Sequence, residues 1–286
     1  MKIKKAVITA AGLGTRLLPA TKETPKEMLP LFVKSGNNQI HVKPLLQIVF
    51  EQMYDFGLRD FCFIVGRGKR SIEDHFIPDP HFIRELNDRE KSEFADDLER
   101  FYSMLRESDI TWKNQLSPKG FGDAVLHSEN FVGKEPFLMH AGDTFIISKG
   151  NNFFNRLVDA YEKNKAEVTL LCEKVEDPHR YGVIIGKETE KGVYRVQRMV
   201  EKPKRPLSNL VSVAVYLFDP VIFKALRETP YRSGEKELTD AIQKLIEKGK
   251  KVYAVELKPD EERLDIGKTD TYKSALDRSY SWAARQ

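Results

Sequence analysis

Short apolar runs alternate with helical patterns along the first half of the chain, which is typical of βαβ units and a largely parallel sheet. The runs Lys5–Ala10 (KAVITA) and Asp60–Gly66 (DFCFIVG) predict two strands. Between them, residues 43–57 place apolar side chains close to a 3.6-residue period and end at a glycine, which predicts a helix. The alternation continues with a helix at 69–76, strands at 109–115 and 136–143, and a helix near 123–130.

Residues 84–106 are heavily charged, yet they keep a helical spacing of apolar residues. Phe94, Leu98, Phe101 and Leu105 recur at positions i, i+4, i+7 and i+11, which indicates an amphipathic helix and not a disordered charge run. No predicted strand interrupts this segment, so it lies outside the strand–helix alternation. An oligomer interface, a lid over the site and plain scaffolding all stay open as its role.

The second half of the chain clusters its strands and then returns to helices. Strands are predicted at 168–173, 183–185, 193–200, 210–218 and 251–257, and helices at 220–226, 236–248 and 269–285. No internal repeat, low-complexity tract or long linker divides the chain, so residues 1–286 are expected to form one domain. The predicted fold class is α/β, with a Rossmann-like mixed, mostly parallel central sheet flanked by helices and a small additional β region.

Composition narrows the class of protein. The 47 basic and 43 acidic residues give a net charge of +4, and no concentrated basic tract suggests nucleic-acid binding. Cys62 and Cys172 lie in apolar runs without metal-ligand spacing, so both are expected to be buried and reduced. The apolar stretch 6–11 is shorter than the roughly 7–15 residues of a secretory signal core, and no run reaches the roughly 18 residues of a membrane helix. A cytoplasmic protein without a membrane partner is therefore expected.

The stretch after the first strand, AAGLGTRLLPATKETPKEMLP (10–30), combines glycines, prolines and fixed positive charge. A glycine-rich turn exposes backbone N–H groups to an anion, and cations such as Arg16 and Lys26 strengthen phosphate binding. The Walker pattern fails because Gly14 is not followed by Lys-Ser or Lys-Thr, and the Rossmann fingerprint fails because Leu17 stands at the third glycine. The prolines are expected to keep this loop from coiling into a helix, so that both cations reach one ligand.

This loop resembles the signature of the sugar-1-phosphate nucleotidyltransferases, and more narrowly of the prokaryotic branch that uses UTP and glucose 1-phosphate. VGRGKRSIEDHF (65–76) is similar to a second segment of that branch, and RYGVI (180–184), MVEKPK (199–204) and LDIGK (264–268) follow in the family's order. The resemblance spans nearly the whole chain. It implies the nucleotide-diphospho-sugar transferase type of fold, in which the small β region serves the sugar.

The reaction implied by the resemblance transfers a uridylyl group from UTP to α-D-glucose 1-phosphate and gives UDP-glucose and pyrophosphate, with Mg²⁺ as cofactor. The attacking phosphate oxygen is already anionic, so no general base is required. The enzyme must instead align two mutually repelling anions and neutralise charge on the leaving pyrophosphate. Fixed cations and a metal ion meet that requirement without a His or Ser nucleophile.

The resemblance also assigns roles within the glycine loop. Arg16 would hold the departing β- and γ-phosphates, and Lys26 would stabilise charge on the α-phosphate during transfer. Four residues would line or approach the nucleotide: Ala11, Gly12, Gly14 and Glu27.

Asp143 and Asp265 would be the metal ligands. Asp143 ends a buried run, where open α/β sheets place their ligands, and Mg²⁺ bound to phosphates needs only one or two protein carboxylates. The family's Gly-Asp-Asp reads Gly142-Asp143-Thr144 here, which retains the first acid and not the second. Phe145 argues against the DxD motif of glycosyltransferases.

The base and the sugar phosphate have candidate residues of their own. Gln115 and Gly120 match the positions that read the base, since a glutamine offers both a donor and an acceptor to a pyrimidine edge. The segment QLSPKGFGDAV (115–125) departs from the branch pattern QxxPLGLGHAV, with Lys119 in place of Leu and Asp123 in place of His. Three further residues are implied for the hexose and its phosphate: Gly182, Glu201 and Lys202.

Two other functions stay open at this point. The chemistry could be the same with dTTP or another hexose 1-phosphate, or the chain could be a catalytically silent paralogue that binds sugar nucleotides and regulates a partner. Such a paralogue should have lost a catalytic cation or a metal ligand, whereas this chain keeps all of them. A nicotinamide oxidoreductase is disfavoured because the dinucleotide fingerprint fails. The resemblance further implies a homo-oligomer, either a dimer or a tetramer.

Overall fold

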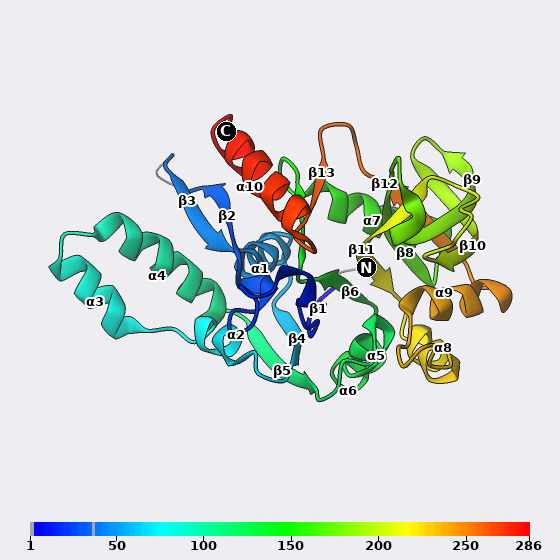
Figure 1. Cartoon of the computed structure of the whole chain (residues 1–286), viewed down its shortest axis with the longest axis horizontal. Coiled ribbons are helices and arrows are strands. Elements are labelled where there is room, and N and C mark those ends of the chain that lie inside the picture. The colour runs from blue at the N-terminus through cyan, green and yellow to red at the C-terminus, as the bar shows by residue number, and fades with distance from the viewer. Residues whose placement is uncertain (1–2, 36–37) are drawn as a thin grey trace.

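A nine-stranded mixed sheet forms the centre of the structure, a computed structural model that describes residues 3–35 and 38–286 (Figure 1). In spatial order its strands are β5 (Asp109–Gln115), β4 (Asp60–Gly66), β1 (Lys5–Ala10), β6 (Phe137–Ala141), β11 (Leu210–Phe218), β8 (Val168–Lys174), β12 (Val252–Glu256), β10 (Val193–Glu201) and β9 (Gly182–Glu190). Only β11 and β10 run against the other strands of this sheet. The predicted mixed, mostly parallel α/β sheet is confirmed.

Helices cover both faces of the sheet, because its strands are apolar on both sides. In β1, Ala6 and Ile8 belong to one core cluster and Val7 to the other. The first cluster is covered by α1 (Leu45–Asp55), α2 (Arg70–His75), α4 (Ser92–Arg106), α7 (Asn152–Asn164) and α10 (Thr269–Ala283), and the second by α5 (Phe121–Leu126), α6 (Glu129–Val132), α8 (Val221–Glu228) and α9 (Leu238–Glu247). Within the described ranges, no helix has the length and apolar character needed to cross a bilayer.

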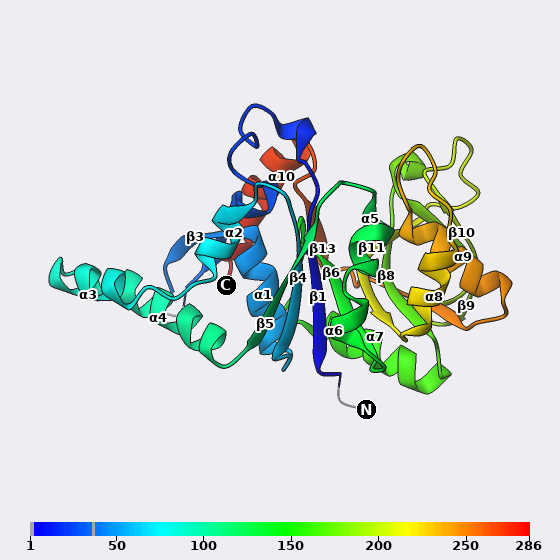
Figure 2. The ribbon, with the colours of Figure 1, turned by 90° about the horizontal axis from the view of Figure 1, so that it is seen from below.

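The parallel strands bring their carboxyl ends to one edge of the sheet. In register, Thr9 of β1 pairs with Ala141 of β6, and Gly66 of β4 pairs with Gln115 of β5. In Figure 2 β1 runs upward from the N-terminus, and both the loop that follows it and the connection from β5 to α5 lie at the upper end. The fold therefore gathers these loops at the edge where open α/β sheets place their ligands.

Two small sheets supplement the central one. The hairpin β2 (Pro30–Lys34) and β3 (Ile40–Pro44) packs under α10, and β7 (Thr144–Ile147) pairs with β13 (Glu262–Asp265). The far edge of the central sheet also curls, because Val183 of β9 pairs with Val211 of β11 in addition to the β9–β10 ladder. The two small sheets confirm the predicted additional β region.

The single helix predicted across residues 84–106 is wrong. The segment forms α3 (Pro80–Asp88) and α4 (Ser92–Arg106), and Glu90 between them has φ 59°, a left-handed conformation that no helix continues through. The two helices pack against each other and extend away from the sheet at the left of Figure 1.

Other predicted helices differ from the structure at their ends. The helix expected from residue 43 begins at Leu45, because residues 40–44 pair as β3. The helix expected near 123–130 is split into α5 and α6. Five elements were not predicted at all: β2, β3, β7, α7 and β13.

Candidate active site

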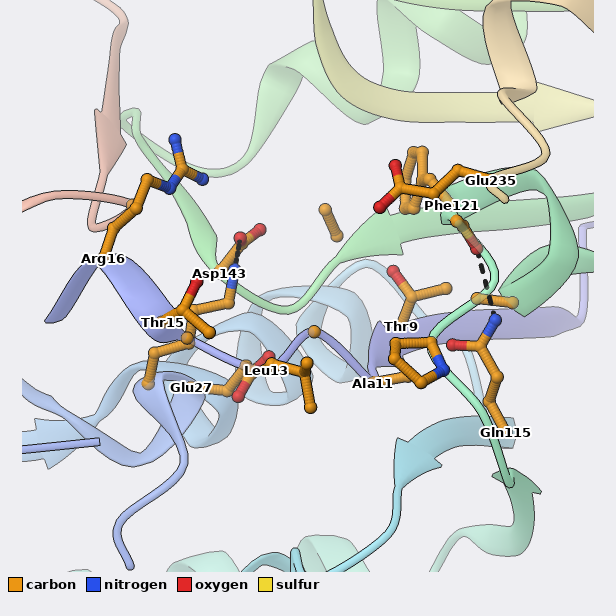
Figure 3. A pocket seen from close by; sticks show the side chains of 18 of the residues that line it. Thr9, Ala11, Leu13, Thr15, Arg16, Glu27, Gln115, Phe121, Asp143 and Glu235 are labelled. Carbon is orange, nitrogen blue, oxygen red and sulfur yellow. Dashed lines mark hydrogen bonds and ion pairs between the residues drawn. The ribbon is translucent and has the colours of Figure 1, made fainter. Parts of the chain in front are cut away.

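A cleft of about 420 Å³ opens at the carboxyl-terminal edge of the sheet (Figure 3). It lies between the loop after β1, the turn at residues 26–28, the connection from β5 to α5 and the end of β6. Ten of the predicted site residues line it: Ala11, Gly12, Gly14, Arg16, Lys26, Glu27, Gln115, Gly120, Asp143 and Lys202. The other three lie directly behind this wall: Gly182, Glu201 and Asp265.

The Lys26 ammonium group donates a hydrogen bond to Asp143 Oδ2 inside the cleft. Lys26 begins the short 3-10 turn Lys26–Met28, and Asp143 follows the last residue of β6 by two positions. Burial lowers the pKa of Lys26, but the Asp143 carboxylate outweighs burial and raises this pKa above its ordinary value. Burial likewise raises the pKa of Asp143, and Lys26 more than offsets it, so the net pKa of Asp143 is lowered. Both groups are therefore charged at neutral pH.

Glu27 forms a buried ion pair with Lys69, whose Nζ lies 2.9 and 2.7 Å from its two carboxylate oxygens. Burial raises the pKa of Glu27 and lowers the pKa of Lys69, and each partner opposes the shift of the other. Lys69 immediately precedes α2, so this pair joins the glycine loop to the second sequence motif. Glu27 lines the cleft as expected of a residue near the nucleotide, but its carboxylate is held by Lys69, which fixes the turn that carries Lys26.

Arg16 and Asp265 come together on the other side of the glycine loop. Arg16 lies in the 3-10 turn Thr15–Leu17, and a Cβ placed on Gly267 would lie 3.4 Å from its Nη2 and 3.1 Å from Asp265 Oδ1. The backbone N–H of Gly267 donates to Asp265 Oδ1 at 3.0 Å. In Figure 3 the Arg16 side chain stands near Asp143. Arg16 and Lys26 both line the cleft, so the two cations of the loop border the same space.

The β7–β13 ladder brings Asp265, at the end of β13, next to the turn between β6 and β7 that carries Asp143. Asp265 is in register with Thr144, the residue after Asp143. Carboxylate oxygens suit a hard cation such as Mg²⁺, which takes its remaining ligands from water and phosphate. Across residues 3–35 and 38–286, no group of three or more His, Cys, Asp or Glu side chains could hold a metal on its own. This donor set fits an ion that enters the cleft together with a polyphosphate.

The opposite end of the cleft is built around Gln115 and Gly120. Gln115 ends β5 and is 4% exposed, and its Nε2 donates to the Gly120 carbonyl at 3.2 Å and to Asp123 Oδ2 at 2.8 Å. Gly120 has φ 96°, and a Cβ there would lie 2.7 Å from backbone atoms of Lys236. No side chain fits at position 120, so the chain can approach a ligand closely here.

Gly182, Glu201 and Lys202 form a third group with two residues of the α9 region. Glu201 pairs in register with Gly182, and its Oε2 accepts a hydrogen bond from Thr239 Oγ1 at 2.6 Å. Lys202 Nζ lies 2.9 Å from Glu201 Oε1 and 3.6 Å from Glu237 Oε1. Burial lowers the pKa of Lys202, but Glu201 and Glu237 raise it above its ordinary value. Burial, with Glu201 close by, raises the pKa of Glu237.

Several residues of this site were not expected from the sequence. Glu235 and Glu237 line the cleft, although they lie just before α9 in a charged segment that matches no motif. Lys69 stands in the second motif, but nothing in the sequence links it to Glu27. Asp123 was noted only as a departure from the branch pattern, and its contact with Gln115 depends on the turn between β5 and α5.

The chain is similar to known nucleotidyltransferases over nearly all of its length. Residues 5–279 match the family model described as nucleotidyl transferase. The UTP–glucose-1-phosphate uridylyltransferase of Bacillus subtilis (strain 168) is 38% identical over 270 residues, which are 93% of this chain and 87% of that protein. The enzyme of the same name from Pseudomonas aeruginosa (strain PAO1) is 33% identical over 283 residues, which are 97% of this chain and 96% of that protein.

Solved structures resemble this one in fold as well as in sequence. A UDP-glucose pyrophosphorylase in complex with UDP-glucose superposes with a TM-score of 0.83 and 32% identity, covering 98% of this chain and 99% of that one. The site residues above therefore lie in a scaffold that is shared over its whole length.

Proposed function

The chain belongs to the nucleotidyl transferase family, and from that premise we propose that it transfers a uridylyl group from UTP to α-D-glucose 1-phosphate, releasing pyrophosphate and forming UDP-glucose. One observation carries the proposal. A single cleft is lined by the amide of Gln115, the two loop cations, the carboxylate of Asp143 and the ammonium group of Lys202. These groups come from segments spread between Arg16 and Lys202, so the fold has to assemble them.

In the proposed reaction an oxygen of the sugar phosphate attacks the α-phosphorus of UTP. The new O–P bond forms as the bond between the α-phosphorus and the bridging oxygen of the pyrophosphate breaks, and the electron pair leaves with the pyrophosphate. The nucleophile is anionic at neutral pH, so catalysis depends on alignment and charge neutralisation. The chain meets this need with fixed cations aimed into the cleft.

Arg16 and Lys26 are assigned different phosphates. Arg16, near Gly267, would bind the β- and γ-phosphates that depart. Lys26 would stabilise charge on the α-phosphate, because its ammonium group, which donates one hydrogen bond to Asp143, has further N–H donors for a phosphate oxygen. Lys202, between Glu201 and Glu237, would bind the sugar phosphate while the carboxylates accept hydrogen bonds from sugar hydroxyls.

Asp143 and Asp265 are proposed to hold Mg²⁺. A bound Mg²⁺ would neutralise charge on the phosphates and orient them for in-line attack. We also propose that the chain forms a homo-oligomer, either a dimer or a tetramer. Analytical ultracentrifugation of the purified chain measures its oligomeric state.

Pyrophosphate release from each nucleoside triphosphate with glucose 1-phosphate tests the proposal. We expect turnover with UTP, dependence on Mg²⁺, and its loss in Arg16→Ala with an unchanged circular dichroism spectrum. Unchanged turnover in Arg16→Ala would remove this residue from the mechanism. Faster thymidylyl than uridylyl transfer would reassign the nucleotide, and no turnover with any sugar phosphate would favour a silent sugar-nucleotide-binding protein.

A further inference from the structure

The side-chain amide of Gln115 is held in one orientation by its neighbours. Its Nε2 donates to Asp123 Oδ2 at 2.8 Å and to the Gly120 carbonyl at 3.2 Å. A carboxylate and a backbone carbonyl can only accept, so a flipped amide would set its own oxygen against two other oxygens. Figure 3 shows the Gln115 nitrogen at one end of a dashed hydrogen bond, with the side-chain oxygen of Gln115 pointing away from that bond. No other described residue donates a hydrogen bond to that oxygen.

Asp123 is itself fixed from the other side. Its Oδ1 accepts a hydrogen bond from the Tyr231 hydroxyl at 2.8 Å, which also raises the pKa of Tyr231. His127 Nε2 lies 3.5 Å from Oδ2. Asp123 is 7% exposed in the first turn of α5 and does not line the cleft, whereas Gln115 does. Asp123 therefore contacts a lining residue of the cleft through its hydrogen bond from Gln115.

We propose that Asp123 is a specificity-determining positioning residue, which locks the Gln115 amide so that its carbonyl oxygen faces the base. This inference rests on the proposed function, because it concerns the base of the nucleotide in this cleft. An acceptor at this place pairs with the N3–H of uracil or thymine. Cytosine is rejected, because its N3 is itself an acceptor and would face the carbonyl oxygen unpaired. The lock does not separate uracil from thymine, which share the same N3–H edge.

The test is equilibrium binding of UTP and of CTP with Mg²⁺, without sugar phosphate, measured by isothermal titration calorimetry. The wild-type chain is expected to prefer UTP. In Asp123→Ala the dissociation constant of CTP divided by that of UTP should fall about tenfold. This change corresponds to the loss of one neutral hydrogen bond in a buried site. Asp123→Asn should keep most of the preference, because its amide oxygen can accept from Gln115 while its NH₂ group donates to the Tyr231 hydroxyl.

A double-mutant cycle separates positioning from a general loss of stability. In the Gln115→Ala background, adding Asp123→Ala should leave the UTP-to-CTP ratio unchanged, since the group that Asp123 positions is gone. Glu261→Gln is the matched control. Glu261 is 9% exposed, and its carboxylate accepts a hydrogen bond from Arg156 at 2.8 Å. The substitution should therefore lower the melting temperature, and Glu261 does not line the cleft.

Three results would overturn the inference. The first is an unchanged UTP-to-CTP preference in Asp123→Ala. The others are an equal fall in this preference when Asp123→Ala is added to Gln115→Ala, or the same fall in Glu261→Gln. Binding with the expected ratios but no transfer to glucose 1-phosphate would reject the proposed function and leave the role of Asp123 standing. A wild-type chain that binds neither nucleotide would reject both.

Discussion

Lys26 and Asp143 are 117 positions apart in the chain, and the fold sets the lysine ammonium group directly on the aspartate carboxylate. Each residue compensates the charge of the other. The pair thereby holds the cation proposed to bind phosphate and the anion proposed to bind the metal ion in place before any substrate arrives, which would reduce the reorganisation needed for catalysis.

Replacement of either partner should abolish most turnover. We expect Lys26→Met and Asp143→Asn each to lower kcat by about 100-fold or more, the size of the loss when one preorganised charge is removed from an active site. Lys22→Met is the control, because Lys22 lies in the same loop with its side chain 76% exposed. A steady-state pyrophosphate assay measures all three variants. Equal activity of Lys26→Met and Lys22→Met would contradict the role of Lys26.

The Glu27–Lys69 ion pair should affect stability mainly because removal of one partner leaves the other charged and buried without a counter-charge. Lys69→Met leaves a buried carboxylate without a counter-charge and is expected to lower the free energy of unfolding by about 3–5 kcal/mol. The double variant Glu27→Gln/Lys69→Met removes both charges and should be less destabilised than Lys69→Met. Urea unfolding gives these values, and Lys273→Met, from an exposed ion pair, should change stability by less than about 1 kcal/mol.

Gly120→Ala should damage the base end of the cleft. A Cβ at this position would lie 2.7 Å from the Lys236 backbone, in addition to the strain of φ 96°. We expect a loss of about 3 kcal/mol or more in unfolding free energy and a raised KM for UTP. Gly249→Ala is matched to it, because Gly249 has φ 76° but open space around it, and should cost only about 1 kcal/mol. Equal effects of the two variants would show that crowding at position 120 does not matter.

His140 should make stability depend on pH between about 4 and 6.5. It is fully buried in β6, and burial lowers its pKa from 6.5 to about 4. Below pH 6.5 the unfolded chain binds a proton at this histidine that the folded chain does not bind, so acid favours unfolding. The contribution amounts to about 3 kcal/mol by pH 4, at 1.36 kcal/mol per pH unit.

The variant His140→Leu removes that titration and should flatten the dependence of unfolding free energy on pH in this range. Chemical denaturation at a series of pH values measures the slope, and His179→Gln, at an exposed histidine, should keep the slope of the wild-type chain. A slope that is the same in all three proteins would assign the acid sensitivity to other groups.

The strands with continuous apolar runs were predictable from the sequence, because burial on both faces of a parallel sheet leaves a local signal. The bounds of β1, β4, β5 and β11 agree with those expected from residue pattern alone. The pattern failed where the signal was weak or interrupted. The strands β7 and β13 contain four residues each, and Glu90 breaks an otherwise helical stretch through its own backbone conformation.

By itself, the sequence determined the kind of fold, the glycine loop with its cations, and the family to which these motifs belong. All of these depend on residue type and short-range spacing. Only the tertiary structure decided that Lys26 contacts Asp143, that Glu27 is paired with Lys69, and that Asp123 orients Gln115. Such contacts join segments that are distant in the chain or depend on how a turn is folded. Their energies follow from separation and burial in space, which local periodicity does not encode.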